Sequence, residues 1–454
     1  MSENPGDPAW QRYHELLAES GMAADSAAAM EQQLHDQGLL FGERPLCTVL
    51  RPRFVSLAEY RFISRACALV GSAFEKLRLR AMVDAGLRAR FGLNEWEENL
   101  IHADPGFRAA SPTSRLDAFH IPGRNQIQFT EYNAETPAGA AYNDALSAAF
   151  LTMPVMQAFA RTHMVIPVPA APGVVNSLLD AWHEWRGTRE KPRVVILDWK
   201  EVPTYSEFVL FEWEFHARGI DAFIGDPRDA EYSNGQLRVA GKPVNFIYKR
   251  VLIDELVERE GLDSPVVRAV KDGAVCMVNP FRCKLLHKKA SLAVLSDERQ
   301  ADLLNPDERE AVKNFVPWTR LVEERHTDHA SGPVDLVPFI VRNREHLVLK
   351  PNDEYGGKGI VLGWLVDDAA WAQAVQTALA EPYIVQERVT IPSEPWPAIV
   401  DGSLHIGERM LDTAPFLSNG TTVSGCLTRI ATDPLLNVTA GGGSNIPTFL
   451  VEAR

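Results

Sequence analysis

The feature that most constrains this 454-residue chain is a glycine-rich turn between two apolar stretches. Residues 347–361 read LVLKPNDEYGGKGIV, which predicts a strand, a turn and a second strand. Glycines in the turn let backbone N–H groups approach phosphate oxygens, and lysines place positive charge beside them. The residues concerned are Lys350, Gly356, Gly357, Lys358 and Gly359. The segment therefore predicts a loop that binds a nucleoside triphosphate, with a surface hairpin carrying solubilising lysines as the alternative.

The spacing within this turn excludes the two commonest phosphate loops. It contains neither a Gly-x-x-x-x-Gly-Lys-Ser/Thr motif nor a Gly-x-Gly-x-x-Gly motif opening a helix. The turn also carries Asn352, Asp353 and Glu354, and its acids suit a triphosphate only if they point outward or help to hold a metal. A nucleotide site here therefore belongs to a different architecture.

The acidic composition restricts the partners of the chain. Its formal net charge is −14, which argues against nucleic acid or an anionic membrane as the main partner. No uncharged apolar run approaches the ~20 residues of a membrane span. The first residues, MSENPGDP, lack the basic and apolar regions of an export signal. We therefore expect a cytoplasmic protein.

The cysteines support the same location. They are odd in number, sparse and mostly set in apolar surroundings, which predicts reduced core residues and neither disulfides nor a zinc site. They are Cys47, Cys67, Cys276, Cys283 and Cys426.

Hydrophobic periodicity divides the chain into four parts and predicts an α/β (α+β) fold. At this length, with 46% hydrophobic residues, the chain can form two or three domains. Residues 1–111 are mainly helical, 112–190 carry strands and an alanine-rich helix, 191–278 form a small α/β unit, and 279–454 carry the phosphate loop. We expect helices at 10–17, 60–79, 82–91 and 140–160, strands at 46–50 and 126–132, a β-α-β unit over 193–224, and a hairpin turn at Asn234-Gly235.

A first polar constellation lies on two consecutive predicted strands. Arg115 and Asp117 are two apart, as are Glu131 and Asn133, so each pair shares one face of its strand. Neighbouring hairpin strands would bring a guanidinium, two carboxylates and an amide oxygen together. Such oxygen ligands suit Mg²⁺. A surface salt bridge between the arginine and the acids is the alternative.

A second constellation places a lysine where a helix begins. Lys289 precedes an apolar helix, where positive charge opposes the helix dipole unless an anion is present. A triphosphate would supply that anion, whereas Lys288 is better explained as a surface lysine in water. Further along, residues 383–389 predict an edge strand that could bind adenine through its backbone, with Gln386, Glu387 and Val389 at its end. An ordinary core strand would look the same.

A third constellation lies near the end of the sequence. A strand containing Arg429 is followed by the glycine triplet Gly441, Gly442 and Gly443. Glycines leave such a loop free to close over a reacting group, and the apolar segment that follows argues against a flexible linker.

The order of these motifs resembles the circularly permuted ATP-grasp proteins, in particular the branch of glutathionylspermidine synthase and eukaryotic-type glutathione synthetase. The metal-binding acid and asparagine precede both lysines here, whereas in ordinary ATP-grasp enzymes they follow the adenine strand. The resemblance covers roughly residues 112–450, and the ordered set is more specific than any one motif. It rests on Glu131 and Asn133, then Lys289, then Lys350 with its glycine loop, then Gln386 and Glu387, then Arg429 and the glycine triplet.

The resemblance implies roles for these residues. Lys289 and Lys350 would grip the α- and β-phosphates under a cover formed by residues 356–359. Asp117, Glu131 and Asn133 would coordinate Mg²⁺. Arg115 and Arg429 would stabilise the transferring phosphoryl group, the triplet 441–443 would close near the acceptor, and residues 193–250 would form the small domain that precedes the ATP-grasp modules.

The chemistry implied is ATP-dependent ligation of a carboxylate to an amine through an acyl phosphate, with Mg²⁺. Its partners would be small-molecule substrates, and the family implies a homodimer. Glu135, Asp144 or the substrate would supply the base, and Lys249-Arg250 would bind a substrate carboxylate or pair at a strand end. A small-molecule phosphotransferase and a non-catalytic nucleotide-binding protein are the alternative functions.

Overall fold

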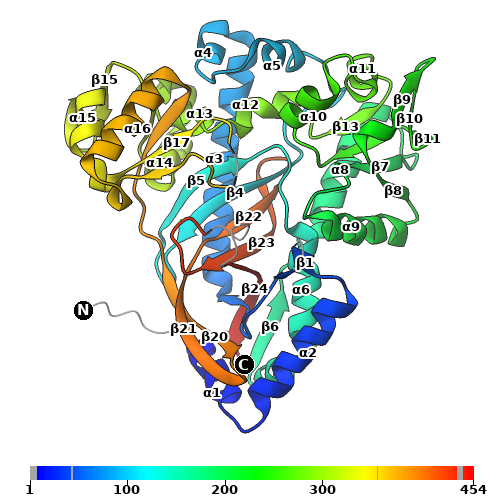
Figure 1. Ribbon diagram of the computed structural model, residues 1–454, viewed down its shortest axis with the longest axis vertical. Coiled ribbons are helices and arrows are strands. Elements are labelled where there is room, and N and C mark those ends of the chain that lie inside the picture. The colour runs from blue at the N-terminus through cyan, green and yellow to red at the C-terminus, as the bar shows by residue number, and fades with distance from the viewer. Residues whose placement is uncertain (1–7, 42–43, 355, 437–442) are drawn as a thin grey trace.

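A large mixed sheet joins distant parts of the chain. The computed structural model describes residues 8–41, 44–354, 356–436 and 443–454 (Figure 1). Within them, a nine-stranded sheet has the order β20-β21-β23-β22-β4-β5, with β24 pairing β23 and also β3 and β6. Its strands are β3 (Arg53–Val55), β4 (Thr113–His120), β5 (Ile127–Asn133), β6 (His163–Pro167), β20 (Ser393–Val400), β21 (Ser403–Leu411), β22 (Ala414–Ser418), β23 (Thr422–Ala431) and β24 (Ser444–Ala453).

Helices dominate the N-terminal region, as expected. A capping box of Ser56 and Glu59 starts the long helix α3, whose buried residues pack into a core with the β4–β5 hairpin. The helices are α1 (Pro8–Leu17), α2 (Met22–Asp36), α3 (Leu57–Val83), α4 (Ala85–Ala89) and α5 (Glu95–Leu100). Short strands β1 (Leu40–Phe41) and β2 (Arg44–Pro45) pair between α2 and α3.

The strand expected at 46–50 is wrong. Leu46, Val49 and Leu50 are buried, but this segment is irregular and the strand of the region is β3. Pro45 and Pro52 flank the segment and cannot donate to a ladder, so the apolar side chains reach the core without strand pairing.

The alanine-rich segment forms two helices where one was expected. Helix α6 (Ala140–Thr152) ends before Met153, and α7 (Pro154–Phe159) begins with Pro154. Proline disfavours helical geometry in the residue before it, and Met153 is extended.

The β-α-β unit is confirmed. Strands β13, β12, β7 and β8 form a parallel sheet in that order, and the Asn234-Gly235 turn joins β9 to β10 with both residues at positive φ. The strands are β7 (Arg193–Leu197), β8 (Asp221–Gly225), β9 (Ala230–Ser233), β10 (Gln236–Val239), β11 (Lys242–Val244), β12 (Phe246–Lys249) and β13 (Cys276–Val278). The helices of this part of the chain are α8 (Ala171–Arg186), α9 (Tyr205–Ala217), α10 (Ile253–Glu260) and α11 (Pro265–Lys271).

The phosphate-loop strands belong to a separate antiparallel sheet of order β14-β19-β17-β18. The predicted pair of strands around the loop is confirmed as β17 (Leu347–Pro351) and β18 (Val361–Leu362). Strand β19 (Tyr383–Glu387) is not the expected edge strand, because β14 (Thr319–Leu321) pairs it on one side and β17 on the other. Other elements here are α12 (Lys284–His287), α13 (Ala290–Leu295), α14 (Pro306–Phe315), β15 (His326–His329), β16 (Gly332–Asp335), α15 (Leu336–Arg342) and α16 (Asp368–Ala380).

The cysteines, the helix lengths and the domain boundaries can now be compared with the sequence predictions. The five cysteines are free and buried, as expected. No helix among the described residues is long and apolar enough to cross a membrane. The boundaries at 111, 190 and 278 stay a prediction, and the nine-stranded sheet takes strands from 1–111, 112–190 and 279–454.

We expect Gly71→Ala to destabilise the protein. Gly71 lies in α3, and a Cβ there would stand 1.8 Å from the carbonyl oxygen of Gly420 in the β22–β23 turn. The atoms that the added Cβ would meet belong to the backbone of the β22–β23 turn, so the helix and the turn would have to move apart. This should lower the free energy of unfolding by about 1–3 kcal/mol, or more. Urea denaturation measures this.

Gly86→Ala is the matched control. It lies in the short helix α4, and its Cβ would stand 3.4 Å from Oδ1 of Asp84, an ordinary contact. It should leave stability unchanged or raise it by up to ~1 kcal/mol. Equal effects of the two substitutions would contradict the close approach.

Candidate functional site

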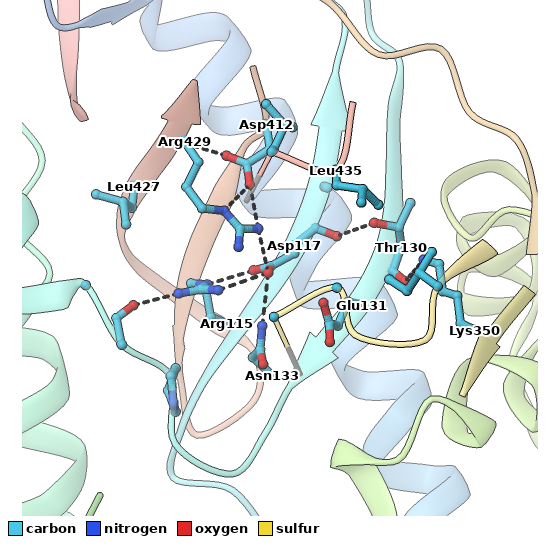
Figure 2. A pocket seen from close by; sticks show the side chains of 18 of the residues that line it. Arg115, Asp117, Thr130, Glu131, Asn133, Lys350, Asp412, Leu427, Arg429 and Leu435 are labelled. Carbon is cyan, nitrogen blue, oxygen red and sulfur yellow. Dashed lines mark hydrogen bonds and ion pairs between the residues drawn. The ribbon is translucent and has the colours of Figure 1, made fainter. Parts of the chain in front are cut away.

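A cavity of about 580 Å³ collects most of the predicted site residues. Strands β4, β5, β17, β19 and β23 contribute to its lining, together with the first glycines of the phosphate loop (Figure 2). The predicted residues that line it are Arg115, Asp117, Glu131, Asn133, Lys350, Gly356, Gly357, Gln386, Glu387, Val389 and Arg429. The structure therefore brings together residues separated by more than 300 positions.

The β4–β5 hairpin fixes the first constellation, as predicted. Arg115 pairs in register with Asn133, and Asp117 with Glu131, so the four side chains lie on neighbouring strands. A register shift directly follows the second pair, between Asp117 and Ala118. Such irregularities often occur where a sheet redirects side chains at a functional site.

Asp117 is the centre of a charged network. Its Oδ1 accepts a hydrogen bond from Nε of Arg115 at 2.7 Å. Its Oδ2 accepts from Nη2 of Arg115 at 2.9 Å, Nδ2 of Asn133 at 2.9 Å and Nη2 of Arg429 at 2.8 Å (Figure 2). Burial alone would raise the pKa of the Asp117 carboxyl, but the charges of Arg115 and Arg429 outweigh it and hold the pKa at about 2.

Asp412, which sequence reasoning missed, completes this network. It accepts hydrogen bonds from the backbone N and from Nε of Arg429, both at 2.6 Å. Asp412 is 2% exposed and lines the cavity. It lies between β21 and β22, and no local sequence pattern marks it as a partner of Arg429.

Two lysines bring positive charge close to Glu131 and Thr130 on β5. Nζ of Lys289 is 3.1 Å from Oε1 of Glu131 and donates to the backbone oxygen of Glu354. Nζ of Lys350 donates to Oε1 of Gln386 at 2.8 Å and to the backbone oxygen of Thr130 at 3.1 Å. Desolvation lowers the pKa of Lys350 to about 8, and the charge of Lys289 acts in the same direction.

The acids of the phosphate turn are neutralised within the protein. The carboxylate of Asp353 accepts hydrogen bonds from Nζ of Lys284 and from Nζ of Lys288, each at 2.9 Å. Burial alone would raise the pKa of Asp353, but these two lysines hold it far below its usual value. The carboxylate of Glu354 accepts from Lys358 at 3.0 Å. The acidic turn is therefore compatible with a triphosphate.

The interpretation of Lys288 as a surface lysine is wrong. Lys288 is 2% exposed, and its Nζ also lies 2.9 Å from Glu97 of α5. Sequence spacing could not reveal this pairing, because nearly 200 positions separate the two residues. The predicted start of an apolar helix at Lys289 is confirmed by α13.

Asn352 fastens the same turn through hydrogen bonds. Its side chain accepts from the backbone N of Ala290 at 2.8 Å and donates to the oxygen of Phe91 at 2.9 Å. Its backbone oxygen accepts from the N of Lys289 at 2.9 Å. The start of the loop is thus tied to α13 and to the helical N-terminal region.

Several residues of the two predicted glycine loops are not part of the described cavity lining. Gly359 does not appear in the cavity lining, and the side chain of Lys358 is 76% exposed. Gly441 and Gly442 lie outside the described residues. Gly443 is described but does not line the cavity. The proposed roles of these residues stay predictions.

The two candidate bases are held in structural positions. Glu135 is 1% exposed, lies between Lys249 and Lys284, and does not line the cavity. Asp144 caps the start of α8 through the backbone N of Ala170 and Ala171. Neither side chain reaches the cavity.

Other titratable groups do line the cavity. Asp198 and Arg250 lie at the carboxyl edge of the parallel sheet, one residue beyond the register pair Leu197 and Lys249. Open α/β sheets bind ligands at this edge. Burial lowers the pKa of His287, which also lines the cavity, to about 4, so its imidazole is neutral at pH 7. The sequence carried a signal for Arg250 at the strand end and none for His287.

An apolar part of the cavity suits a nucleobase. Ile360, Leu362 and Trp364, which follow the phosphate loop, and Val389 and Ile391, which follow β19, contribute to it. Because β19 is paired on both sides, adenine would have to contact the residues beyond the strand and not the strand backbone.

The oxygen atoms that remain available fit Mg²⁺. Figure 2 shows the amide nitrogen of Asn133 directed at Asp117 and its oxygen end directed away. That oxygen and the Glu131 carboxylate suit a metal that takes one or two carboxylates and completes its shell with phosphate and water. Among the described residues, no group of three or more His, Cys, Asp or Glu could hold a metal alone.

Comparison with known proteins supports the fold. No family model matches the chain. A solved glutathione synthetase-like effector from Globodera pallida superposes with a TM-score of 0.61 and 11% identity, over 96% of this chain and 99% of that one. The mixed α/β, ATP-grasp-like fold class is thereby confirmed at the level of overall fold, whereas the circular permutation and the branch stay predictions.

A second solved structure gives only a weak likeness. It is D-alanyl-alanine synthetase A from Vibrio cholerae O1 biovar eltor, with a TM-score of 0.24 and 10% identity over 48% of this chain and 67% of that one. That score is too low to indicate a shared fold.

Two curated relatives share sequence along the chain. They are provisionally named glutamate–cysteine ligase 2-2 of Frankia casuarinae and glutamate–cysteine ligase 2-3 of Frankia alni, each 22% identical to this chain. The matches cover 93% and 92% of this chain but 50% and 49% of the relatives. The chain thus spans about half the length of the curated relatives it matches.

The buried ion pairs predict how stability depends on pH. Burial alone would raise the pKa of Glu135, but Lys284 and Lys249 hold it at about 2, below the unfolded value of roughly 4.3. Its stabilisation is present above pH ~4.3 and is lost as the pH falls towards 2. Across that window the free energy of unfolding should fall by roughly 3 kcal/mol, which urea denaturation at each pH measures.

Glu135→Gln should flatten this dependence. At pH 7 it should also cost about 3–5 kcal/mol, because the buried lysines lose a compensating charge. Glu31→Gln, at an exposed position, is the control. An unchanged acid dependence in Glu135→Gln would contradict the assignment.

Proposed function

We propose that the chain is an ATP-dependent ligase that joins a carboxylate to an amine, releasing ADP and phosphate through an acyl phosphate. The observation that carries the proposal is that Arg115, Arg429 and Lys350 line one cavity together with the acids of the β4–β5 hairpin. The fold shared with a glutathione synthetase-like effector supports it. So do the ligase names of the two relatives.

The cationic groups would stabilise the charge of phosphoryl transfer. A substrate carboxylate attacks the γ-phosphorus of ATP, the bond to the β–γ bridging oxygen breaks, and ADP leaves. Lys289 and Lys350 would hold the phosphates, and Arg115 and Arg429 would stabilise the equatorial oxygens of the transferring group. Mg²⁺, when bound by Glu131 and Asn133, would neutralise part of the phosphate charge.

An amine would then displace phosphate from the acyl phosphate. Only the neutral amine is nucleophilic, so a proton must leave the ammonium form before or during attack. Asp198, Glu255 and neutral His287 are among the cavity-lining groups that could accept this proton. The proposed small-molecule partners remain a carboxylate and an amine. A cytoplasmic location and a homodimer remain proposals too.

The alternative functions differ in their need for an amine. A phosphotransferase would form ADP with an acceptor alone, and a non-catalytic protein would bind nucleotide without turnover. The neutralisation of Asp353 by Lys284 and Lys288 removes the main sequence argument for a decayed site.

ADP formation should require both substrates. Purified protein with ATP and Mg²⁺ should release ADP only when pools of amino acids, small peptides or polyamines supply both a carboxylate and an amine. Lys350→Ala should lower the rate by about 100-fold or more, because it removes a positive charge that stabilises the transition state. Glu31→Gln is again the control.

The other results of this assay also discriminate. ADP formed without an amine would favour the phosphotransferase. Absence of ADP in every pool, together with no thermal shift on adding Mg-ATP, would contradict the nucleotide site.

Nucleotide affinity should fall at alkaline pH. Only the charged form of Lys350 attracts phosphate, and its pKa in the free protein is about 8. The dissociation constant of a non-hydrolysable ATP analogue should therefore rise above pH 8, up to about 10-fold per pH unit. Calorimetry from pH 7 to 9.5 measures this, and Lys350→Arg should remove most of the dependence because arginine stays charged.

A further inference from the structure

We propose that Asp353, held by two buried lysines, is a positioning residue that places Lys289 and the first glycines of the phosphate loop for contact with the phosphates of ATP. This inference rests on the proposed function. It gives Asp353 a role other than the two expected from the sequence, which were to point outward or to help hold a metal. The lysines are Lys284 in α12 and Lys288 directly after that helix.

The first argument is the direction of the Asp353 side chain. Its Oδ2 accepts hydrogen bonds from Nζ of Lys284 and from Nζ of Lys288, each at 2.9 Å, and its Oδ1 accepts from Lys284 at 3.0 Å. The two lysines are 1% and 2% exposed. Neither they nor Asp353 line the cavity. The contacts therefore hold the backbone of the turn from outside the cavity.

The second argument is that the residues on either side of Asp353 contact both ends of Lys289. The backbone oxygen of Asn352 accepts a hydrogen bond from the backbone N of Lys289 at 2.9 Å. The backbone oxygen of Glu354 accepts one from its Nζ. Asp353 thus lies at the centre of a three-residue segment that determines where a proposed phosphate-binding lysine lies.

The third argument is that the same segment leads into the glycines of the cavity. Gly356 and Gly357 lie within four positions of Asp353, and both line the cavity. Their φ angles are 64° and 80°, a region that glycine adopts without steric cost. Because glycine permits many backbone conformations, the position of these N–H groups depends on where the preceding residues are anchored.

The anchor continues into the N-terminal region through Glu97 of α5. Nζ of Lys288 lies 2.9 Å from Oε2 of Glu97, and Nζ of Lys284 lies 3.5 Å from its Oε1. Glu97 is 1% exposed, and its Oε2 also accepts from the backbone N of Asn94 at 2.7 Å. The lysines that hold Asp353 are thus themselves fixed by a helix that contributes no described residue to the cavity lining.

A simple effect of charge predicts the opposite result. An acid beside a triphosphate repels it, so removing the charge of Asp353 would then strengthen nucleotide binding. Removing an anchor weakens binding, because phosphate donors work best when they are already in place. Glu354 offers the comparison within the same turn. Its carboxylate accepts from Lys358 at 3.0 Å, and its side chain is 38% exposed.

The experiment compares Asp353→Asn with Glu354→Gln, each an isosteric loss of one carboxylate. Calorimetry with Mg²⁺ measures the dissociation constants of a non-hydrolysable ATP analogue and, by competition, of adenosine. In Asp353→Asn that of the analogue should rise about 10-fold or more, because bonds to charged phosphate are lost. That of adenosine, which has no phosphate, should stay within about 2-fold. Glu354→Gln should not weaken either ligand.

Three results would overturn the proposal. The first is analogue binding to Asp353→Asn that is unchanged or tighter. The second is an equal loss for adenosine and the analogue, which would indicate a general structural defect. The third is an equal loss in both variants, which would indicate an effect of net charge.

A double-mutant cycle tests whether Asp353 acts through Lys289. The losses of analogue affinity in Asp353→Asn and Lys289→Met should be non-additive, so the double variant should bind little more weakly than the weaker single variant. Additive losses would overturn the role through Lys289. Circular dichroism and thermal midpoints establish that each variant is folded.

The unaltered protein gives an answer that needs no folded variant. In crystals with Mg²⁺ and the ATP analogue, Asp353 should keep its contacts with Lys284 and Lys288, and Nζ of Lys289 should lie about 2.7–2.9 Å from a phosphate oxygen. A structure in which either of the two lysines leaves Asp353 for a phosphate, or in which Asp353 binds the metal, would overturn the proposal. Failure of the analogue to bind the unaltered protein would instead contradict the proposed function.

Discussion

The register of β4 against β5 determines how charge is distributed in the cavity. It sets Arg115 opposite Asn133 and Asp117 opposite Glu131, so that one guanidinium, one amide and two carboxylates lie together on neighbouring strands. A shift by one residue would send every one of these side chains to the opposite face. The core formed with α3 fixes this register, because Leu116 and Tyr132 of the other face are buried in it.

Burial and charge balance act together around the phosphate loop. Lys284 and Lys288 are almost fully buried, which is tolerable because the carboxylates of Asp353, Glu97 and Glu135 lie beside them. The loop is consequently tied to α5 and α12, which are distant in sequence from β17 and β18, the strands on either side of the loop. The geometry of the loop thus depends on the N-terminal region, which the sequence predicted only to be mainly helical.

The sequence predicted what short-range patterns can carry. The strands around the loop, the β-α-β unit and the facing pairs on β4 and β5 all follow from residue spacing over a few positions. Partners contributed by distant segments were missed, namely Asp412 for Arg429 and Glu97 for Lys288, because no local pattern encodes them. The strand expected at 46–50 failed because burial, and not ladder pairing, explains its apolar residues. The edge position of β19 failed because pairing with β14 cannot be inferred from β19 alone.

The position of β24 has a consequence for how this chain can fold. Residues 448–450 of β24 pair in parallel with residues 53–55 of β3, and the same strand pairs β6 and β23. These contacts join segments almost 400 positions apart, a separation that slows folding because a long loop must close first. Among the described strands, β3 and β6 pair only with β24, so on the ribosome they would lack a strand partner until residues 444–453 emerge. During that interval they expose unsatisfied strand edges, which are sites for aggregation or chaperone binding.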